Sequence, residues 1–220
     1  YPNGAWPQRY EEFPNAEEFS VDKARYPETW SREFPKERYY TFYTFNDNSI
    51  ADIMATMVEA YKTYDDARYV EAAKRGGDFM ILAQMPEPQS VWAQQYNLNM
   101  EPAWARQFEP PSVTGGETFG IMRALLDLYV ETGEERFLEP IPKALAWAKR
   151  SMLPDGRLAR FYELKTNTPL YFTKGDYVLT YDDSNMPTHY AFKVSGGRVG
   201  SVETYYDRVV QEGREVVLAE

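Results

Sequence analysis

Apolar residues recur every three or four positions in four stretches of the chain, which is the spacing that places them on one face of an α-helix. The first stretch follows Asp47 and Asn48, and either side chain is suited to cap the first turn of a helix. The four stretches fall into two closely spaced pairs, so we expect two helical hairpins. The predicted helices cover residues 48–61, 67–82, 117–129 and 136–152.

The residues on either side of these stretches lack helical periodicity. The first 43 residues contain five prolines. Because proline removes a backbone donor and breaks helices, we expect an irregular segment that wraps over the core. Beyond residue 152, short apolar runs alternate with glycine-containing turns, which predicts short strands followed by a last helix. The runs are residues 171–172, 177–179 and 190–194, and the last helix is expected over about residues 202–210.

One kind of loop occurs three times. Residues 4–10, 90–96 and 156–162 align without gaps, and each has a turn residue, a large apolar residue two places on and a tyrosine six places on. A repeated unit of hairpin and loop predicts a mainly α fold, an incomplete α/α toroid of helical hairpins with long loops and a few short β-strands. A plain orthogonal helix bundle remains the alternative. We expect one catalytic-type domain over residues 1–220, made of the wrapping segment 1–43, the hairpins 44–152 and the segment 153–220.

Composition narrows the partners that this chain can have. A formal net charge of -10 argues against nucleic acid, because phosphate backbones select basic surfaces. An acidic polysaccharide stays possible, since a bound cation inverts the sign of a site locally. No apolar run is long enough for a membrane span, and cysteine is absent. Aromatic residues make up 16% of the chain, and they serve either to pack helices or to face sugar rings.

Residues 44–49 (Thr-Phe-Asn-Asp-Asn-Ser) stand at the start of the first predicted helix. Any one of these polar side chains is explained by helix capping. Three carboxamide or carboxylate side chains in succession exceed what one cap requires. Calcium prefers oxygen ligands of this kind, so Asp47 is a candidate metal ligand or a bridge between metal and substrate.

Residues 101–112 form a second candidate segment, held rigid by prolines near both ends. It presents Trp104, Arg106, Phe108 and Glu109. One interpretation is a structural pair between Arg106 and Glu109. The other is an arginine that recognises a sugar carboxylate between aromatic rings.

A third polar segment runs from residue 173 to 190 and includes Lys174 and the single histidine, His189. A lone histidine more often makes structural hydrogen bonds than catalyses a reaction, and no Ser or Cys nucleophile motif lies nearby. The sequence also has no Walker loop, dinucleotide-binding fingerprint or zinc spacing.

Residues 92–96 (Trp-Ala-Gln-Gln-Tyr) and 101–112 (Glu-Pro-Ala-Trp-Ala-Arg-Gln-Phe-Glu-Pro-Pro-Ser) closely resemble the main signature of the pectate lyases of polysaccharide lyase family 10. Residues 44–48 and 4–10 are similar to two further motifs of that family. Their order and approximate spacing agree from residue 1 to about 193. The resemblance implies a secreted, periplasmic or cell-surface enzyme, expected to be a monomer, that cleaves α-1,4-linked polygalacturonate by calcium-assisted β-elimination.

The resemblance also implies roles for individual residues. Asp47 matches the acid that holds calcium or substrate, and Arg106 matches the Brønsted base. The second role requires a neutral guanidine, although free arginine is normally protonated. Lys174 lies where a basic substrate-binding residue is expected. Further substrate contacts are expected from Trp104, Asn46 and His189.

Two departures from the family pattern modify these expectations. Family members carry an additional helical hairpin with another acid upstream of the segment matched by residues 4–10, so we expect incomplete calcium coordination by this chain alone. Residues 186–190 (Met-Pro-Thr-His-Tyr) stand where a substrate-binding arginine is expected. Two alternatives stay open. One is a non-catalytic pectin-binding protein with the same cleft, and the other is an α/α-toroid glycoside hydrolase that pairs Asp47 with Glu109 or Glu117.

Overall fold

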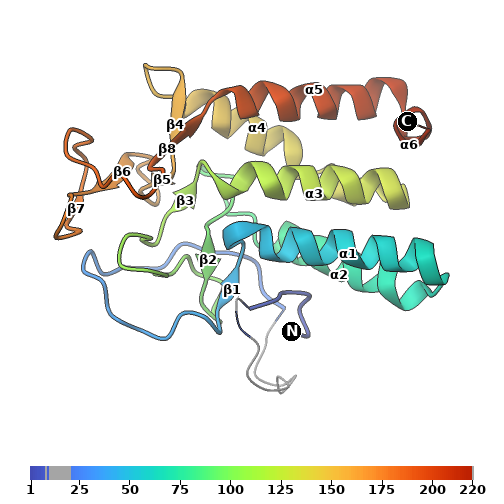
Figure 1. The fold of residues 1–220 in the computed structure, drawn as a ribbon, viewed down its shortest axis with the longest axis horizontal. Coiled ribbons are helices and arrows are strands. Elements are labelled where there is room, and N and C mark those ends of the chain that lie inside the picture. Colours follow the sequence, from blue (N-terminus) through green and yellow to red (C-terminus); the bar gives the residue numbers. More distant parts are fainter. Residues whose placement is uncertain (8, 10–20, 220) are drawn as a thin grey trace.

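The computed structural model describes residues 1–7, 9 and 21–219, and most of its regular structure is helical. The helices are α1 (Ser49–Tyr64), α2 (Ala67–Leu82), α3 (Glu117–Thr132), α4 (Ile141–Arg150), α5 (Gly197–Glu212) and α6 (Arg214–Leu218). The five long helices lie side by side, and the strands and long loops gather at one end of them (Figure 1). α1, α3 and α5 begin at this end, which is called the loop end below, whereas α2 and α4 finish there.

Close helix packing around α2 depends on two glycines. A Cβ atom at Gly76 would lie 2.7 Å from Cγ of Met54 on α1, and one at Gly77 would lie 2.5 Å from a methyl carbon of Leu128 on α3. Both distances are shorter than side chains tolerate, so only glycine permits this approach. The hairpin of α1 and α2 therefore packs directly on α3.

Three helix predictions need correction. The helix predicted from residue 136 is interrupted. Residues Glu135–Phe137 form a short 3-10 turn, and α4 begins only at Ile141, because prolines at 140 and 142 favour the first turn of a helix and not its interior. α5 is longer than the predicted 202–210. Asn48 occupies the N-cap position of α1 but makes no side-chain capping hydrogen bond, and the Asp47 carboxylate accepts instead from the Asn46 side chain (3.2 Å).

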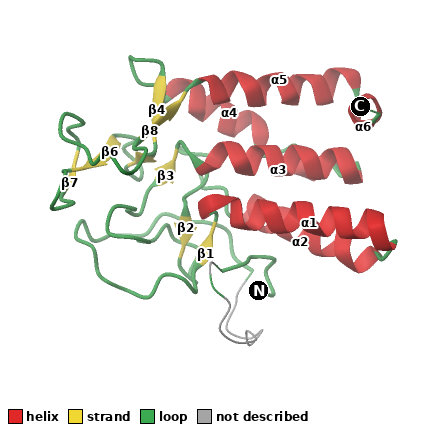
Figure 2. Ribbon diagram, in the orientation of Figure 1, coloured by secondary structure: helices red, strands yellow, loops and turns green. Residues whose placement is uncertain are grey.

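The strands are short and all pair antiparallel (Figure 2). β1 (Tyr43–Thr44) pairs with β2 (Gln95–Tyr96), and β4 (Arg157–Ala159) pairs with β8 (Lys193–Ser195). A four-stranded sheet has the order β3-β5-β6-β7, formed by Val113–Thr114, Phe161–Tyr162, Pro169–Phe172 and Leu179–Thr180.

The predicted strands at 177–179 and 190–194 are only partly correct. Tyr177 has a positive φ of 55° in a turn, and β7 begins two residues later. In the second run, only residues 193 and 194 belong to a strand.

The predicted loop repeat has a clear structural basis in two of its copies. The Tyr96 hydroxyl accepts a hydrogen bond from the backbone N–H of Ala93 (2.7 Å). It donates to the carbonyl of Ala83, the C-cap residue of α2 (2.6 Å). The Tyr162 hydroxyl repeats this arrangement between Ala159 and Ser151, at the end of α4. Each tyrosine thus fastens its loop to the end of the preceding helix. The first copy includes positions 8 and 10, which lie outside the described residues.

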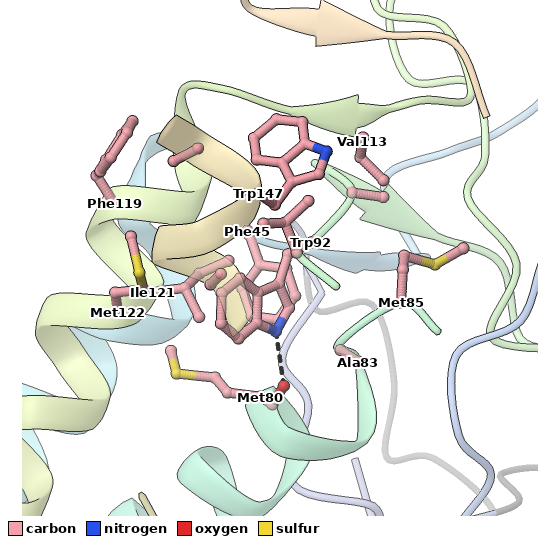
Figure 3. Close-up of a cluster of buried hydrophobic side chains, with 14 of the residues drawn as sticks. Phe45, Met80, Ala83, Met85, Trp92, Val113, Phe119, Ile121, Met122 and Trp147 are labelled. Carbon is pink, nitrogen blue, oxygen red and sulfur yellow. Dashed lines mark hydrogen bonds between the residues drawn. The ribbon is translucent and has the colours of Figure 1, made fainter. Parts of the chain in front are cut away.

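The core is a continuous cluster of buried side chains from the helices and the loop end. In Figure 3, Trp92 lies among Phe45, Met80 and Ile121, and its indole N–H donates to the carbonyl of Met80 (2.7 Å). The loops therefore contribute core side chains and do not merely cover the helices. None of the helices in the described ranges has the length and apolar character needed to cross a membrane.

Candidate active site

Asp47 lies in a tight turn, Asn46–Asn48, immediately before α1. Asp47 and Asn48 have φ angles of 52° and 57°, in the left-handed region that aspartate and asparagine adopt more readily than most residues. Asn48 fits against α3, because a Cβ atom at Gly120 would lie 2.6 Å from its Oδ1 atom. Asn46 is buried and Asp47 is exposed, so the turn offers one carboxylate to solvent at the loop end.

Arg106 and Glu109 form an ion pair within the proline-flanked segment. Nε of Arg106 donates to one carboxylate oxygen of Glu109 (2.9 Å), and a terminal nitrogen donates to the other (2.5 Å). The backbone N–H of Arg106 also donates to this carboxylate (3.0 Å). The side chain of Glu109 is 2% exposed, whereas that of Arg106 is 42% exposed. The pair therefore presents a guanidinium to solvent above a buried carboxylate.

Aromatic rings surround the Arg106 guanidinium. Its Cζ atom lies 4.9 Å from the ring centroid of Phe108 and 5.5 Å from that of Tyr190, which are cation–π distances. His189 and Tyr177 pack against Phe108 at centroid distances of 5.3 Å and 5.6 Å. This cluster restricts the guanidinium to one position and supplies apolar ring surface beside it.

A second arginine–glutamate pair stands next to the first. Arg160 donates to the Glu117 carboxylate (2.7 Å) and to the carbonyl of Ala191 (2.8 Å), and its Cζ atom lies 4.7 Å from the centroid of Tyr190. The Tyr190 hydroxyl in turn donates to Glu109 (2.9 Å). Tyr190 therefore lies between the two arginines and connects the two pairs.

Burial and neighbouring groups shift the pKa values of the residues in this cluster. Burial alone would raise the pKa of Glu109, but the hydrogen bonds from the side chain and backbone of Arg106 outweigh it and lower the pKa. The same contact with Glu109 raises the pKa of Arg106 above its usual value. Burial and the Glu109 charge raise the pKa of the Tyr190 phenol. Arg106 is thus held in its protonated form in the absence of substrate.

The Asp47 turn and the Arg106 segment are linked indirectly, through Gln94 and Tyr190. The backbone N–H of Phe45 donates to the carbonyl of Gln94 (2.8 Å), and the Gln94 side-chain oxygen lies 3.4 Å from the Tyr190 hydroxyl. Tyr190 also binds Glu109, the partner of Arg106. The two residues singled out in the sequence therefore belong to one connected part of the molecule.

The other expected site residues occupy different environments. Lys174 and His189 are both exposed, and His189 packs against the rings of Phe108 and Tyr177. Trp104 is 7% exposed, donates its indole N–H to the carbonyl of Ser31 (2.9 Å) and packs on Phe172. This indole lies in the interior and does not present a face to solvent. Asn46, also buried, reaches the site through its hydrogen bond to Asp47.

Comparison with known proteins identifies the family. The sequence model described as pectic acid lyase matches residues 1–158, most of the chain. The chain belongs to the pectic acid lyase family. It is therefore an enzyme of the polysaccharide lyase class, as the motifs predicted. No curated protein matches the chain in sequence.

Two solved structures share the fold of this pectic acid lyase. A mutant of the family 10 polysaccharide lyase from Cellvibrio cellulosa in complex with trigalaturonic acid has a TM-score of 0.69 and 21% sequence identity. The match covers 95% of this chain and 68% of that one. The family 10 polysaccharide lyase from Cellvibrio cellulosa has a TM-score of 0.64 and 22% identity, with coverage of 80% and 65%. These likenesses confirm the predicted incomplete α/α toroid.

The pectic acid lyase family suggests calcium, for which Asp47 is the candidate ligand. Calcium takes six to eight oxygen ligands. In the described part of the chain, no three His, Cys, Asp or Glu side chains come together to hold a metal. Asp47 offers one exposed carboxylate, beside the carboxamides of Asn46 and Asn48. This donor set does not enclose an ion, but it fits a cation whose remaining ligands come from substrate and water.

Arg160 and Tyr190 were not predicted as parts of this lyase site. Their partners lie far away in sequence, since 43 positions separate Arg160 from Glu117 and 81 separate Tyr190 from Glu109. One signal was present in the loop repeat. Arg160 and Gln94 occupy equivalent positions in two copies, and both side chains contact Tyr190.

Proposed function

We propose that this pectic acid lyase cleaves α-1,4-linked polygalacturonate by β-elimination, with Arg106 as the base and Asp47 as the carboxylate that holds a calcium ion. The main support is the half-exposed Arg106 guanidinium, framed by aromatic rings and connected to the Asp47 turn at the loop end. The trigalaturonic acid bound to the Cellvibrio relative is consistent with an oligogalacturonate substrate.

The reaction makes specific demands on these residues. A base removes the proton from C5 of a galacturonate, the bond from C4 to the glycosidic oxygen breaks, a C4–C5 double bond forms, and the leaving oxygen gains a proton. Arg106 accepts a proton only as a neutral guanidine, and Glu109 opposes that form by raising its pKa. We therefore infer that Glu109 positions Arg106 before substrate binds, and that this contact loosens before proton transfer.

The remaining residues bind and orient the polyanion. Calcium bound between Asp47 and a substrate carboxylate would act as a Lewis acid and make the C5 proton more acidic. Lys174 and His189 are exposed and are suited to meet further carboxylates. Asn46 orients the Asp47 carboxylate, and Trp104 supports the segment from inside. Because the substrate is a polymer, we expect a secreted or cell-surface enzyme, acting as a monomer.

The glycoside hydrolase alternative finds less support. A general acid needs a raised pKa and access to the glycosidic oxygen. Glu109 is buried beneath Arg106 with a lowered pKa, and Glu117 is buried in its pair with Arg160. Neither carboxyl group is available to donate a proton to a substrate at the surface.

An elimination assay tests the proposal. The full chain is incubated with polygalacturonate and calcium, and absorbance is followed in the ultraviolet band of the 4,5-unsaturated product. We expect turnover by the wild type and a loss of at least about a hundredfold in Arg106→Gln. Arg25→Gln, which removes a different exposed arginine, serves as the charge-matched control. Binding of oligogalacturonides without any product would instead favour the non-catalytic pectin-binding protein.

A further inference from the structure

A cavity of about 280 Å³ lies at the loop end, beside the Asp47 turn. Residues at the starts of three helices line it. They are Asn48 before α1, Gly116 and Phe119 at the start of α3, and Arg198 in the first turn of α5. Gly120 and Arg123 of α3 and Ser201 of α5 complete the wall.

Two guanidinium groups give this cavity a positive character. Arg123 donates to the hydroxyl of Ser201. Neither Arg123 nor Arg198 forms an ion pair with any carboxylate in the described ranges 1–7, 9 and 21–219. Glu117 is bound by Arg160, whereas the Asp127 carboxylate accepts from the Tyr205 hydroxyl (2.8 Å) and also interacts electrostatically with Arg123. A protein with a net charge of -10 therefore exposes, at one hollow, two guanidinium groups that have no direct ion pair among the described residues.

Two residues of the cavity wall adjoin residues of the candidate active site. Asn48, which borders the cavity, is the chain neighbour of Asp47. Gly116, also on its border, is in contact range of Arg160, because a Cβ atom there would lie 3.4 Å from a terminal nitrogen of that guanidinium. Arg160 in turn contacts Tyr190, which binds Glu109.

We propose that Arg123 and Arg198 form a second carboxylate-binding subsite for the same polygalacturonate chain, occupied by a galacturonate unit outside the bond that is cleaved. The inference rests on the proposed function, because it takes its ligand from it. A polymer with one carboxylate on each sugar meets several separate cations along its length. Guanidinium groups bind such carboxylates through paired N–H donors. The subsite therefore favours long chains over short ones.

The test compares chain lengths. Arg198→Gln, Arg123→Gln and the double variant are assayed on polygalacturonate and on trigalacturonate, and the ratio of the two kcat/KM values is determined. We expect this ratio to fall about threefold in each single variant and about tenfold in the double variant. The effect should shrink as ionic strength rises, because exposed charges are screened. Arg68→Gln, at the opposite end of the α1–α2 hairpin and 88% exposed, should leave the ratio unchanged.

The variants also separate binding from folding and from chemistry. Arg198→Gln breaks no ion pair among the described residues, so an unchanged Tm with a reduced ratio indicates a binding role. An unchanged ratio in the double variant overturns the subsite even if the wild type is an active lyase. Should the wild type form no unsaturated product, the proposed function fails separately. Retardation in gels that contain polygalacturonate then decides: weaker retardation of the double variant supports the subsite, and equal retardation overturns it.

Discussion

Arg106 meets Glu109 through two parallel N–H···O contacts, while the carboxylate is almost wholly removed from solvent. Such a pair is a strong positioning device, because the carboxylate has no water to replace its partner. It also works against proton abstraction by Arg106. Any role of Arg106 as a base therefore depends on how firmly Glu109 holds it.

The pH profile of activity should report this dependence. Glu109→Gln removes the carboxylate that raises the pKa of Arg106, so the neutral guanidine forms at lower pH. We expect the rising limb of the kcat profile to move to lower pH by about one to two units. The measurement is kcat on polygalacturonate at saturating substrate and calcium across the neutral and alkaline range.

Glu71→Gln is the matched control, since it removes an exposed carboxylate on α2 that pairs with Lys74. Its profile should coincide with that of the wild type. If Glu109→Gln changes KM but leaves the profile in place, Arg106 binds the substrate carboxylate and another group removes the proton.

At the residue scale, sequence patterns predicted Asp47 and Arg106 as prominent groups but could not resolve their environments. The three-residue spacing of Arg106 and Glu109 already suggested a pair, and the structure contains it. The pair of Arg160 with Glu117 could not be foreseen, because it depends on how α3 meets a distant loop. Trp104 was expected to contact substrate, yet burial cannot be deduced from a tryptophan among prolines.

At the scale of elements, Tyr96 and Tyr162 connect loops to helix ends. Replacing either by Phe leaves a backbone N–H and a helix-terminal carbonyl without this partner inside the protein. We expect each variant to lower the free energy of unfolding by about 1–3 kcal/mol, measured by urea denaturation. Tyr64→Phe is the control, because Tyr64 is 70% exposed, and it should change the free energy by less than about 0.5 kcal/mol. Equal stability of all three variants would show that the hydroxyls do not fasten the loops.

Helices were predicted better than strands for a physical reason. Helical periodicity is local, and it located α1, α2 and α3 to within a few residues. The start of α4 was wrong because prolines 140 and 142 are compatible with a first turn but not with a helix interior. Strands of two to four residues are set by distant partners. β1 and β2, for example, pair residues that lie about fifty positions apart.

At the scale of the whole molecule, calcium binding and substrate binding should be coupled. Asp47 supplies one carboxylate. Among the described residues, no three His, Cys, Asp or Glu side chains are grouped so that they could hold a metal ion. Calcium alone should therefore change Tm by no more than about 1 °C. Calcium with trigalacturonate at about a hundred times its Kd should raise the free energy of unfolding by about 2.7 kcal/mol. This corresponds to a rise in Tm of about 5–10 °C.

Thermal unfolding followed by circular dichroism checks this expectation. Asp47→Asn should lose the calcium-dependent part of the shift, whereas Asp52→Asn, one turn into α1, should retain it. A large shift with calcium alone would mean that the protein binds the ion without substrate.

The overall architecture was predictable because the repeated loop can be recognised in the sequence. Its recurrence after helical hairpins indicated hairpins arranged around an axis, which the match to the Cellvibrio lyase confirms. The expectation that Asp47 and Arg106 share one site comes from the family motifs alone. Helical periodicity carries no such information, since it defines faces and not which ends of the helices come together.

The buried phenols at the helix ends have one more consequence, which concerns tolerance of alkali. Burial raises the pKa of Tyr96 and of Tyr162 above the ordinary 10.0, so both keep their protons when a free phenol would already be losing its own. Their stabilising effect is complete below pH 10 and declines only as the solution becomes more basic than that. The loop fastenings therefore hold fully through the neutral and mildly alkaline range, which ends below the pH at which a free guanidinium loses its proton.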